Sequence, residues 1–487
     1  MDEKFKKAFI KGSAAATLGT LISMGFHLFS IGILTRVLPK EAFGGYVIFL
    51  IIVNFFNLVS SLGLNITLVK FISNDKLEEN KSSLRAIMIT RVYTLIFLAV
   101  SYYFISDFVM RIFDLKISSL SYYIPIMFIL SSYKDLFYNV LQGLNEYKKF
   151  SLVQITSALS RLLLIIAAVY YNMLTLDNLI FIEIITSITA IISQLLCFNI
   201  RKLTEVKAGK QVYKSIFKFS LPLYLNSLLT FSYDRLSLFI IGIFLNPVSV
   251  AIYDIGNKIP DALMRMFAPF IIVFFPNSAK LFSQGNHKAG VSLMNKSLNV
   301  FSVGIAILTF IAFLFSKEII VTMFSAAYLP SAAVFALLMV NFYLRVMSNI
   351  MGYSVVSAGY AAIPVKVNAV ASVVNLGISV LAIPAYGYIG AVYAILIMNI
   401  ISQVFYHVYA IKVNLHPEGY KYLYPFFLMI SIVVIQHLIG IEMFYLKVLL
   451  TLIFIVLNWF LITEFKQLVL TSLGFLKKVT NKLKFSV

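Results

Sequence analysis

Apolar segments long enough to cross a lipid bilayer recur along the whole chain. A membrane-spanning helix needs about 20 predominantly apolar residues. Segments of this kind begin near residues 14, 43, 86, 120, 151, 177, 217, 247, 298, 330, 364, 387, 422 and 444. Charged residues make up only 12% of the chain, about half of their usual share in soluble domains. The pattern predicts an all-α polytopic membrane protein with fourteen transmembrane helices and no soluble domain.

The net charge of +20 is distributed as a topology signal. If the N-terminus is cytoplasmic and each segment reverses direction, the inside parts hold 27 Lys and Arg residues and the outside connections hold six. This is the positive-inside rule, which predicts that both termini are cytoplasmic. The basic N-terminus leads straight into the first segment and is expected to be a signal anchor. Since membrane topology accounts for the excess charge, nucleic acid is not expected as a partner.

The sequence contains few groups typical of enzymes or metalloproteins. Cys197 is the single cysteine, and the five histidines are scattered without metal-ligand spacing. Neither a P-loop nor a nucleophile elbow occurs. The outside connections are too short for a catalytic domain of the kind that a polymerase, ligase or glycosyltransferase needs. We therefore expect no cofactor, no metal and no enzymatic activity.

Twelve charged residues nevertheless lie inside the predicted spans. The basic ones are Arg91, Lys134, Arg161, Arg235, Lys258, Arg265 and Arg345, and the acidic ones are Asp135, Glu183, Asp234, Asp254 and Asp261. A charge at the bilayer centre costs about 2.5–3.5 kcal/mol even on the lenient insertion scale. These side chains are therefore expected to face the protein interior or a hydrated cavity. Arg91, near the inner end of its span, is expected to snorkel to the interface.

The eighth span carries a stripe of alternating charge. In YDIGNKIPDALMRMF (253–267), Asp254, Lys258, Asp261 and Arg265 fall on one helix face. One interpretation is two intrahelical pairs, Asp254–Lys258 and Asp261–Arg265, which neutralise each other between helices. The other is that the stripe lines a cavity, where its cations meet an anionic headgroup.

Arg161 and Arg345 lie in mid-span with no acid within four residues. Either can pair with an acid on another helix, for example Glu183, or bind two oxygens of a diphosphate through its planar fork. The adjacent charges of 134–135 and 234–235 point to different helix faces. The predicted substrate-binding cations are Arg161, Arg345, Arg235, Lys258, Arg265 and Lys134. The candidates for coupling to a proton or a sodium ion are Asp234, Asp254, Asp261 and Glu183.

The chain also resembles itself at a shift of 207 to 216 residues. LPKEAFGGYVIF is echoed by NPVSVAIYDI, QGLNEYKKF by SAGYAAIPV, and IISQLL by IISQVF. The repeats predict an N-terminal lobe over 1–205 and a C-terminal lobe over 206–415, each with six spans. Residues 416–487 would add two helices and a basic cytoplasmic tail. Since six is even, both lobes insert in the same orientation, with a substrate site between them.

Three stretches resemble a known family. FSLPLYLNSLLTFSYDRLSLFIIGIFLNPVSVAIYDIGNKI (219–259), FFPNSAKL (274–281) and ILTRVLPKEAFGGYVIF (33–49) are similar to segments of bacterial polysaccharide flippases. These are the O-antigen and capsule-unit exporters of the multidrug/oligosaccharidyl-lipid/polysaccharide superfamily. The resemblance implies a MATE-like fold of two six-helix lobes around a central cavity, with two further C-terminal helices.

The resemblance also implies a function in the bacterial cytoplasmic membrane. The expected activity is alternating-access flipping of an undecaprenyl-diphosphate-linked glycan for surface polysaccharide biosynthesis, alongside a polysaccharide polymerase and other assembly proteins. The alternative is a cation-coupled drug or metabolite exporter of the same superfamily, although such exporters usually have twelve spans and favour acids in the cavity.

Overall fold

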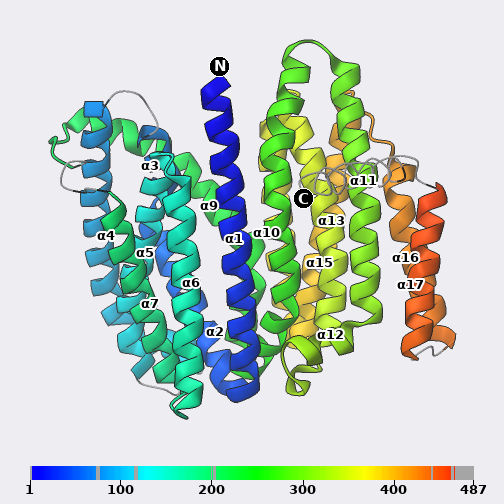
Figure 1. The fold of residues 1–487 in the computed structure, drawn as a ribbon, viewed down its shortest axis with the longest axis horizontal. Helices are drawn as coiled ribbons and strands as arrows, with labels where there is room; N and C mark the ends of the chain where they lie inside the picture. The colour runs from blue at the N-terminus through cyan, green and yellow to red at the C-terminus, as the bar shows by residue number, and fades with distance from the viewer. Residues whose placement is uncertain are drawn as a thin grey trace, which may run out of the picture. The chain divides into compact units, whose positions relative to one another are not determined.

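The protein is described by a computed structural model over residues 3–72, 77–113, 119–198, 200, 204–439, 443–461 and 466. Over these residues the chain consists of helices joined by short turns, without a β-strand (Figure 1). A helix satisfies its own backbone hydrogen bonds, as a chain surrounded by lipid must. The predicted all-α membrane fold is confirmed.

The helices of the first half of the chain are mostly long. They are α1 (Glu3–Val37), α2 (Lys40–Ser61), α3 (Leu64–Ile72), α4 (Leu77–Ile112), α5 (Ser119–Gly143), α6 (Tyr147–Tyr170), α7 (Leu176–Cys197) and α9 (Lys210–Phe244). The second half contains α10 (Pro247–Ser283), α11 (His287–Leu314), α12 (Ser316–Met323), the 3-10 turn η1 (Ala326–Tyr328), α13 (Ser331–Ser357), α14 (Ala362–Tyr386), α15 (Tyr388–Lys412), α16 (Gly419–Ile439) and α17 (Phe444–Leu461).

Each of the fourteen predicted segments coincides with one long helix, and α3, α12 and η1 are additional short elements. Of the helices described, ten are long and apolar enough to cross a membrane. An eleventh is added if the bent pair Lys210–Ser232 and Arg235–Phe244 is one span. The apolar parts of α16 and α17 are shorter. Helix α5 is less apolar because its second half carries the polar run SSYKD at 131–135.

The chain divides into two compact units. Unit 1 comprises Met1–Asp254, Met323–Tyr328 and Ser379–Ala391, and unit 2 comprises Ile255–Thr322, Leu329–Ile378 and Val392–Val487. The lobe boundaries predicted at residues 205 and 415, and the central cavity between the lobes, stay predictions. The basic tail predicted after residue 464 lies outside the described residues except for Lys466.

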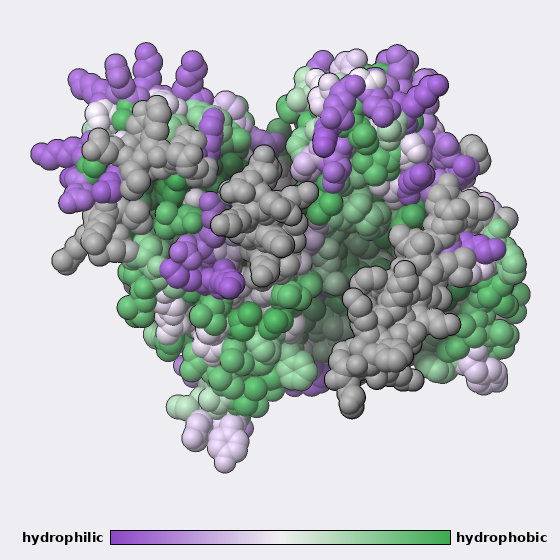
Figure 2. Space-filling view, turned by 45° about the horizontal axis from the view of Figure 1, so that its top comes forward, coloured by the Kyte–Doolittle hydropathy of each residue, from purple (hydrophilic) through white to green (hydrophobic). Residues whose placement is uncertain are grey.

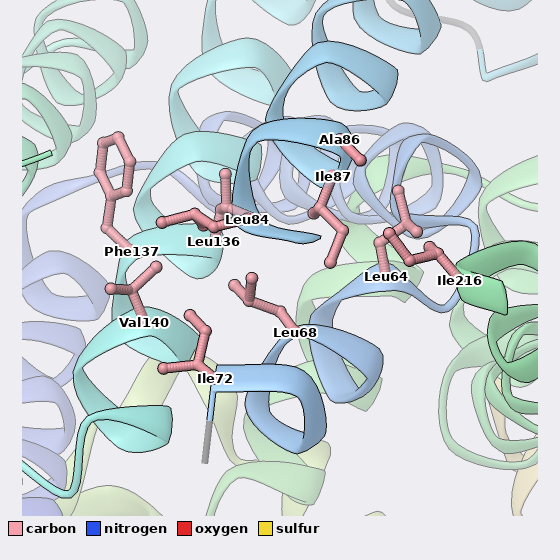
Figure 3. Close-up of a cluster of buried hydrophobic side chains, with 10 residues drawn as sticks. All are labelled: Leu64, Leu68, Ile72, Leu84, Ala86, Ile87, Leu136, Phe137, Val140 and Ile216. Carbon is pink, nitrogen blue, oxygen red and sulfur yellow. The ribbon is translucent and has the colours of Figure 1, made fainter. Parts of the chain in front are cut away.

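The apolar core of unit 1 includes a cluster that joins four helices (Figure 3). Its members are Leu64, Leu68 and Ile72 of α3, Leu84, Ala86 and Ile87 of α4, Leu136, Phe137 and Val140 of α5, and Ile216 of α9. The residues of α3 recur every four positions, and Val140 of α5 follows Leu136 and Phe137 by four and three, which places each set on one helix face. The short helix α3 is therefore anchored inside unit 1 although it cannot span a membrane.

A sharp break separates α2 from α3. Leu62 and Gly63 both have positive φ angles, 46° and 72°, which end a right-handed helix. A Cβ atom on Gly63 would lie 2.3 Å from the backbone oxygen of Ser220 on α9. Only glycine combines this backbone conformation with so close an approach. The break lets α9 pack directly against the turn.

Unit 2 is centred on α11 and α13, which pack against each other. Helices α16 and α17 pack on α11, and the rings of Phe310 and Phe454 lie 4.6 Å apart between α11 and α17. Helix α17 is also held by an ion pair from Lys447 to Glu318 on α12, with 2.6 Å between Nζ and Oε1. The two C-terminal helices are thus attached to unit 2 by both apolar and ionic contacts.

Large apolar side chains cover the sides of the molecule. Tyr103, Phe104, Leu196 and Leu381 are each between 77% and 83% exposed. Figure 2 shows hydrophobic residues over much of the visible surface, with many of the hydrophilic residues gathered in the upper part of the view. Soluble monomers rarely expose apolar patches of this extent. The chain is a multi-pass membrane protein whose exposed apolar side chains face lipid.

Candidate functional site

One charged residue from each of α5, α6 and α7 contributes to a buried polar site inside unit 1. On α7, the buried face carries Glu183, Ser187 and Gln194 at helical spacing. Helices α5 and α6 both pack against α7, and they contribute Lys134 and Arg161. The sequence places polar groups at these positions of otherwise apolar helices, so the polar face must be satisfied by its neighbours.

The centre of this site is a closed triangle of Tyr46, Arg161 and Glu183. Arg161 Nε donates to Glu183 Oε1 at 2.6 Å, and the Tyr46 hydroxyl donates to the same oxygen at 2.7 Å. Arg161 Nη2 donates to the Tyr46 oxygen at 3.0 Å. Arg161 is 6% exposed and Glu183 is 9% exposed. The contact with Glu183 is the pairing that the sequence offered as the alternative to substrate contact.

One nitrogen of the Arg161 guanidinium takes no part in the triangle. Arg161 Nη1 is buried and has no hydrogen-bond partner among the described residues. A guanidinium has five N–H donors, and the contacts with Glu183 and Tyr46 occupy Nε and Nη2. The triangle therefore fixes the orientation of Arg161 while Nη1 stays available for a further acceptor.

Lys134 places a second cation near the same carboxylate. Its Nζ lies 3.5 Å from Ser187 Oγ, and its backbone oxygen accepts a hydrogen bond from Gln194 Nε2 at 3.1 Å. Glu183 is attracted electrostatically by Lys134 as well as by Arg161. Lys134, Arg161 and Glu183 together therefore carry a net charge of +1.

A second polar group of unit 1 joins α2, α3, α4 and α5. Asn57 Nδ2 donates to Asp135 Oδ2 at 2.6 Å. Arg91 donates from Nη1 to Ser60 Oγ at 3.2 Å and from Nη2 to Asn65 Oδ1. Arg91 is fully buried, so the prediction that it snorkels to the interface is wrong. The oxygens at the break between α2 and α3 solvate its charge inside the protein.

The remaining predicted site residues are dispersed over α9, α10 and α13. Arg265 and Asp261 form an intrahelical ion pair, 3.0 Å from Nη2 to Oδ2, with side chains 59% and 34% exposed. Asp254 is buried, while Arg235, Lys258 and Arg345 are half-buried. None of these four is free of interactions with neighbouring groups. The side chain of Asp234 lies outside the part of the chain that the structure describes.

Several residues of the site were not found by the search for charges. Tyr46, Asn57, Ser60, Asn65, Ser187 and Gln194 are neutral. The first five bond to charged side chains, and Gln194 bonds to the backbone oxygen of Lys134. A search for neutral polar residues at helical spacing within apolar helices would have identified Ser187 and Gln194 on the face of Glu183. Within the described residues, no group of three or more His, Cys, Asp or Glu side chains could hold a metal ion.

Solved structures with the same fold are transporters by their titles. A lipid II flippase, MurJ, in an inward closed conformation matches with a TM-score of 0.72 and 13% identity, covering 93% of this chain and 99% of that one. An inward-facing multidrug resistance MATE family transporter of the MOP superfamily matches with a TM-score of 0.67 and 12% identity, covering 80% and 94%. At these identities the similarity shows the fold alone.

A MOP superfamily transporter from Pyrococcus furiosus matches with a TM-score of 0.51 and 11% identity, covering 84% of this chain and 96% of that one. No curated protein sequence matches the chain. The family model described as "Polysaccharide biosynthesis protein" matches residues 9–282, more than half of the 487 residues. The chain therefore belongs to the polysaccharide biosynthesis protein family.

Proposed function

We propose that this protein is a flippase that moves a polyprenyl-diphosphate-linked oligosaccharide across the bacterial cytoplasmic membrane for surface polysaccharide biosynthesis. One combined observation carries the proposal. A chain of the polysaccharide biosynthesis family takes the fold of a lipid II flippase over 93% of its length. The lipid tail would stay in the bilayer while the diphosphate and the sugars pass through the protein by alternating access.

The charges inside unit 1 support an anionic substrate. Arg161, Lys134 and Glu183 together carry a net charge of +1, and Arg161 Nη1 has no partner among the described residues. A diphosphate needs compensating cations in a medium of low dielectric constant. We propose that Arg161 and Lys134 of unit 1 and Arg345 of unit 2 contribute to this compensation, with Arg235, Lys258 and Arg265 as further candidates.

The second candidate function is a cation-coupled drug or metabolite exporter, which the likeness to MATE transporters favours. It would need a carboxylate free to bind a proton or a sodium ion. Glu183 already accepts hydrogen bonds from Arg161 and Tyr46, so a cation would have to displace them. Asp261 likewise accepts a hydrogen bond from Arg265, so a cation would have to displace that partner too. Asp234 and Asp254 complete the proposed coupling residues.

Export in cells tests the proposed role of the cations. Arg161→Lys, Arg345→Lys and Arg345→Ala variants are expressed in a strain that lacks the gene, at equal membrane levels, and surface polysaccharide is quantified. Lysine keeps the charge but loses the bidentate fork, so at least tenfold less polysaccharide is expected from each variant. Lys149→Ala removes a half-buried cation that pairs with Glu146 and serves as the matched control. Normal export by all arginine variants would contradict the assigned role.

Purified protein distinguishes a flippase from an exporter. Proteoliposomes receive a fluorescent polyprenyl-diphosphate trisaccharide, and an impermeant quencher reports how much of it changes leaflet. Transfer above that of empty vesicles supports flipping. If labelled lipid never changes leaflet while the same vesicles exchange an organic cation for protons, the exporter function replaces the proposed one. Proposed partners such as a polysaccharide polymerase can be tested by co-purification.

A further inference from the structure

The first turns of α9 carry a row of exposed lysines. Lys207 lies three residues before the helix begins, and Lys210, Lys214 and Lys218 follow at spacings of three, four and four residues. All four are exposed, and the spacing places the three helical lysines on one face. We call these four residues the lysine strip.

The opposite face of the same turns is buried in unit 1. Ile216 belongs to the apolar cluster with Leu64 and Leu68, and Val212 and Tyr213 pack against that cluster. Lys70 on α3 lies over the ring of Phe219, 3.6 Å from its centroid. The orientation of this part of α9 is thus fixed by its packing, and the lysine strip faces outward from unit 1.

The lysine strip differs from neighbouring basic residues because it lacks counter-charges. Lys81 pairs with Glu205 and Lys149 pairs with Glu146. By contrast, no hydrogen bond or ion pair links the strip lysines to another described residue. The sequence contains no acidic residue from 206 to 233. The strip is therefore an uncompensated positive surface.

Exposed apolar residues continue directly from the lysine strip along α9. Phe217 is 42% exposed, Leu221 is 60% exposed and Leu225 is 57% exposed. Helix α9 has 35 residues, whereas about 20 suffice to cross the hydrocarbon layer. The apolar part thus lies in lipid while the lysines lie at the level of the headgroups, on the side predicted to be cytoplasmic. An ordered helix that emerges from lipid with its cations at the surface fits a membrane better than a soluble acidic protein.

We infer that the lysine strip is a binding surface for the headgroups of anionic phospholipids. Each lysine near an anionic membrane surface raises the affinity about fivefold, so three of them together contribute about a hundredfold. This inference rests on membrane insertion and on the geometry of α9. It is independent of the proposed flippase function.

The test measures binding of fluorescent phosphatidylglycerol to the purified full-length protein in neutral detergent micelles, with phosphatidylcholine as the neutral comparison. The strip variant carries Lys210→Gln, Lys214→Gln and Lys218→Gln. The control variant carries Lys280→Gln, Lys288→Gln and Lys296→Gln, three exposed or half-exposed residues of α10 and α11 that lose the same charge. The substituted strip side chains are solvent-exposed, so unchanged size-exclusion profiles and unfolding temperatures are expected.

The strip variant is expected to bind phosphatidylglycerol about a hundredfold more weakly than the wild type, while the control variant changes less than threefold. Salt is expected to remove the difference, since the screening length falls from about 10 Å at 0.1 M to about 3 Å at 1 M. The inference is overturned if the wild type and the strip variant bind phosphatidylglycerol with equal affinity. It is also overturned if the control variant loses as much affinity as the strip variant. Polyglutamate is added at the same concentration of negative charge as the lipid. If it displaces the lipid completely, the strip is a general polyanion surface and the inference of a lipid site is overturned.

Discussion

Arg161 and Glu183 illustrate how a charge is tolerated inside an apolar unit. Both side chains are buried and share their hydrogen bonds with Tyr46. Breaking a buried pair by removing one partner costs about 3–5 kcal/mol, whereas replacing both partners with apolar residues is often nearly neutral. The pair therefore contributes little net stability, and its main effect is to hold Arg161 in one orientation within the site.

This argument predicts a strongly non-additive double-mutant cycle. Arg161→Met and Glu183→Met are each expected to lower the free energy of unfolding by about 3–5 kcal/mol, and the double variant is expected to recover most of the loss. Thermal unfolding in detergent provides the measurement. Arg265→Met, in the more exposed pair with Asp261, is the matched control and should cost about 1 kcal/mol or less. Simple addition of the two single effects would show that the residues do not act as a pair.

Glu318 provides a pH-dependent contact outside the spans. Burial by itself would raise the pKa of this carboxyl. The hydrogen bond from Lys447, its charge and that of Lys317 outweigh burial and hold the pKa below its ordinary value of 4.5. Because the folded state binds the proton less well than the unfolded state, the contact stabilises the protein above pH 4.5. This contribution is lost as the pH falls through the lower pKa of the folded state.

We therefore expect wild type and Glu318→Gln to differ in stability at pH 7 and to converge in acid. The Glu318 side chain is 42% exposed, so solvent screening limits the difference at pH 7 to about 1 kcal/mol or less. The emission of Trp459, the single tryptophan, reports the unfolding of α17. Glu146→Gln, from the exposed pair with Lys149, controls for the loss of one charge. If the stability difference between wild type and Glu318→Gln grew toward acid pH, it would contradict the expected direction of the pH dependence.

Among the elements, the long helices could be predicted and the short ones could not. All fourteen predicted segments coincide with helices because length and apolarity decide their position in lipid. Helix α3 has nine residues and α12 has eight, too few to span a membrane. Their positions depend on contacts such as Leu68 in the unit 1 core and Glu318 with Lys447, which no local pattern encodes.

The break between α2 and α3 is predicted to depend on Gly63. Gly63→Ala adds a Cβ that would lie 2.3 Å from the Ser220 oxygen at a φ of 72°. A non-glycine residue in this region alone costs of the order of 1–3 kcal/mol, and displacement of α9 adds to it. Gly209→Ala places its Cβ in open space and should change stability by less than about 1 kcal/mol. Equal unfolding temperatures for the two variants would contradict the prediction.

The candidate site could be predicted from the sequence in its charges but not in its pairings. The sequence indicated which charges lie within spans and offered Glu183 as a partner for Arg161, and the structure places these two together. Arg91 was misjudged because its solvation comes from Ser60 and Asn65 at the break before α3. Neutral polar residues leave no mark in a charge pattern, although they decide how each cation is held.

At the scale of the whole molecule, the positive-inside rule predicts which ends of the helices face the cytoplasm. Lys148 and Gln284 are predicted to lie in inside connections, and Met173 and Leu329 in outside connections. All four are exposed, and each unit contains one of each kind. Single cysteines at these positions, in a Cys197→Ser background, can therefore report the orientation of each unit separately.

Intact bacteria are treated with a membrane-impermeant maleimide, and permeabilised cells provide the value for full labelling. Cysteines at 173 and 329 should react in intact cells, whereas those at 148 and 284 should react only after permeabilisation. The same result in both units is required if the two repeats insert in the same orientation, because each predicted repeat has an even number of spans. If 284 reacts and 329 is protected while 173 reacts and 148 is protected, the units are inverted relative to each other. In that case, the alternating-access scheme for parallel repeats would not apply.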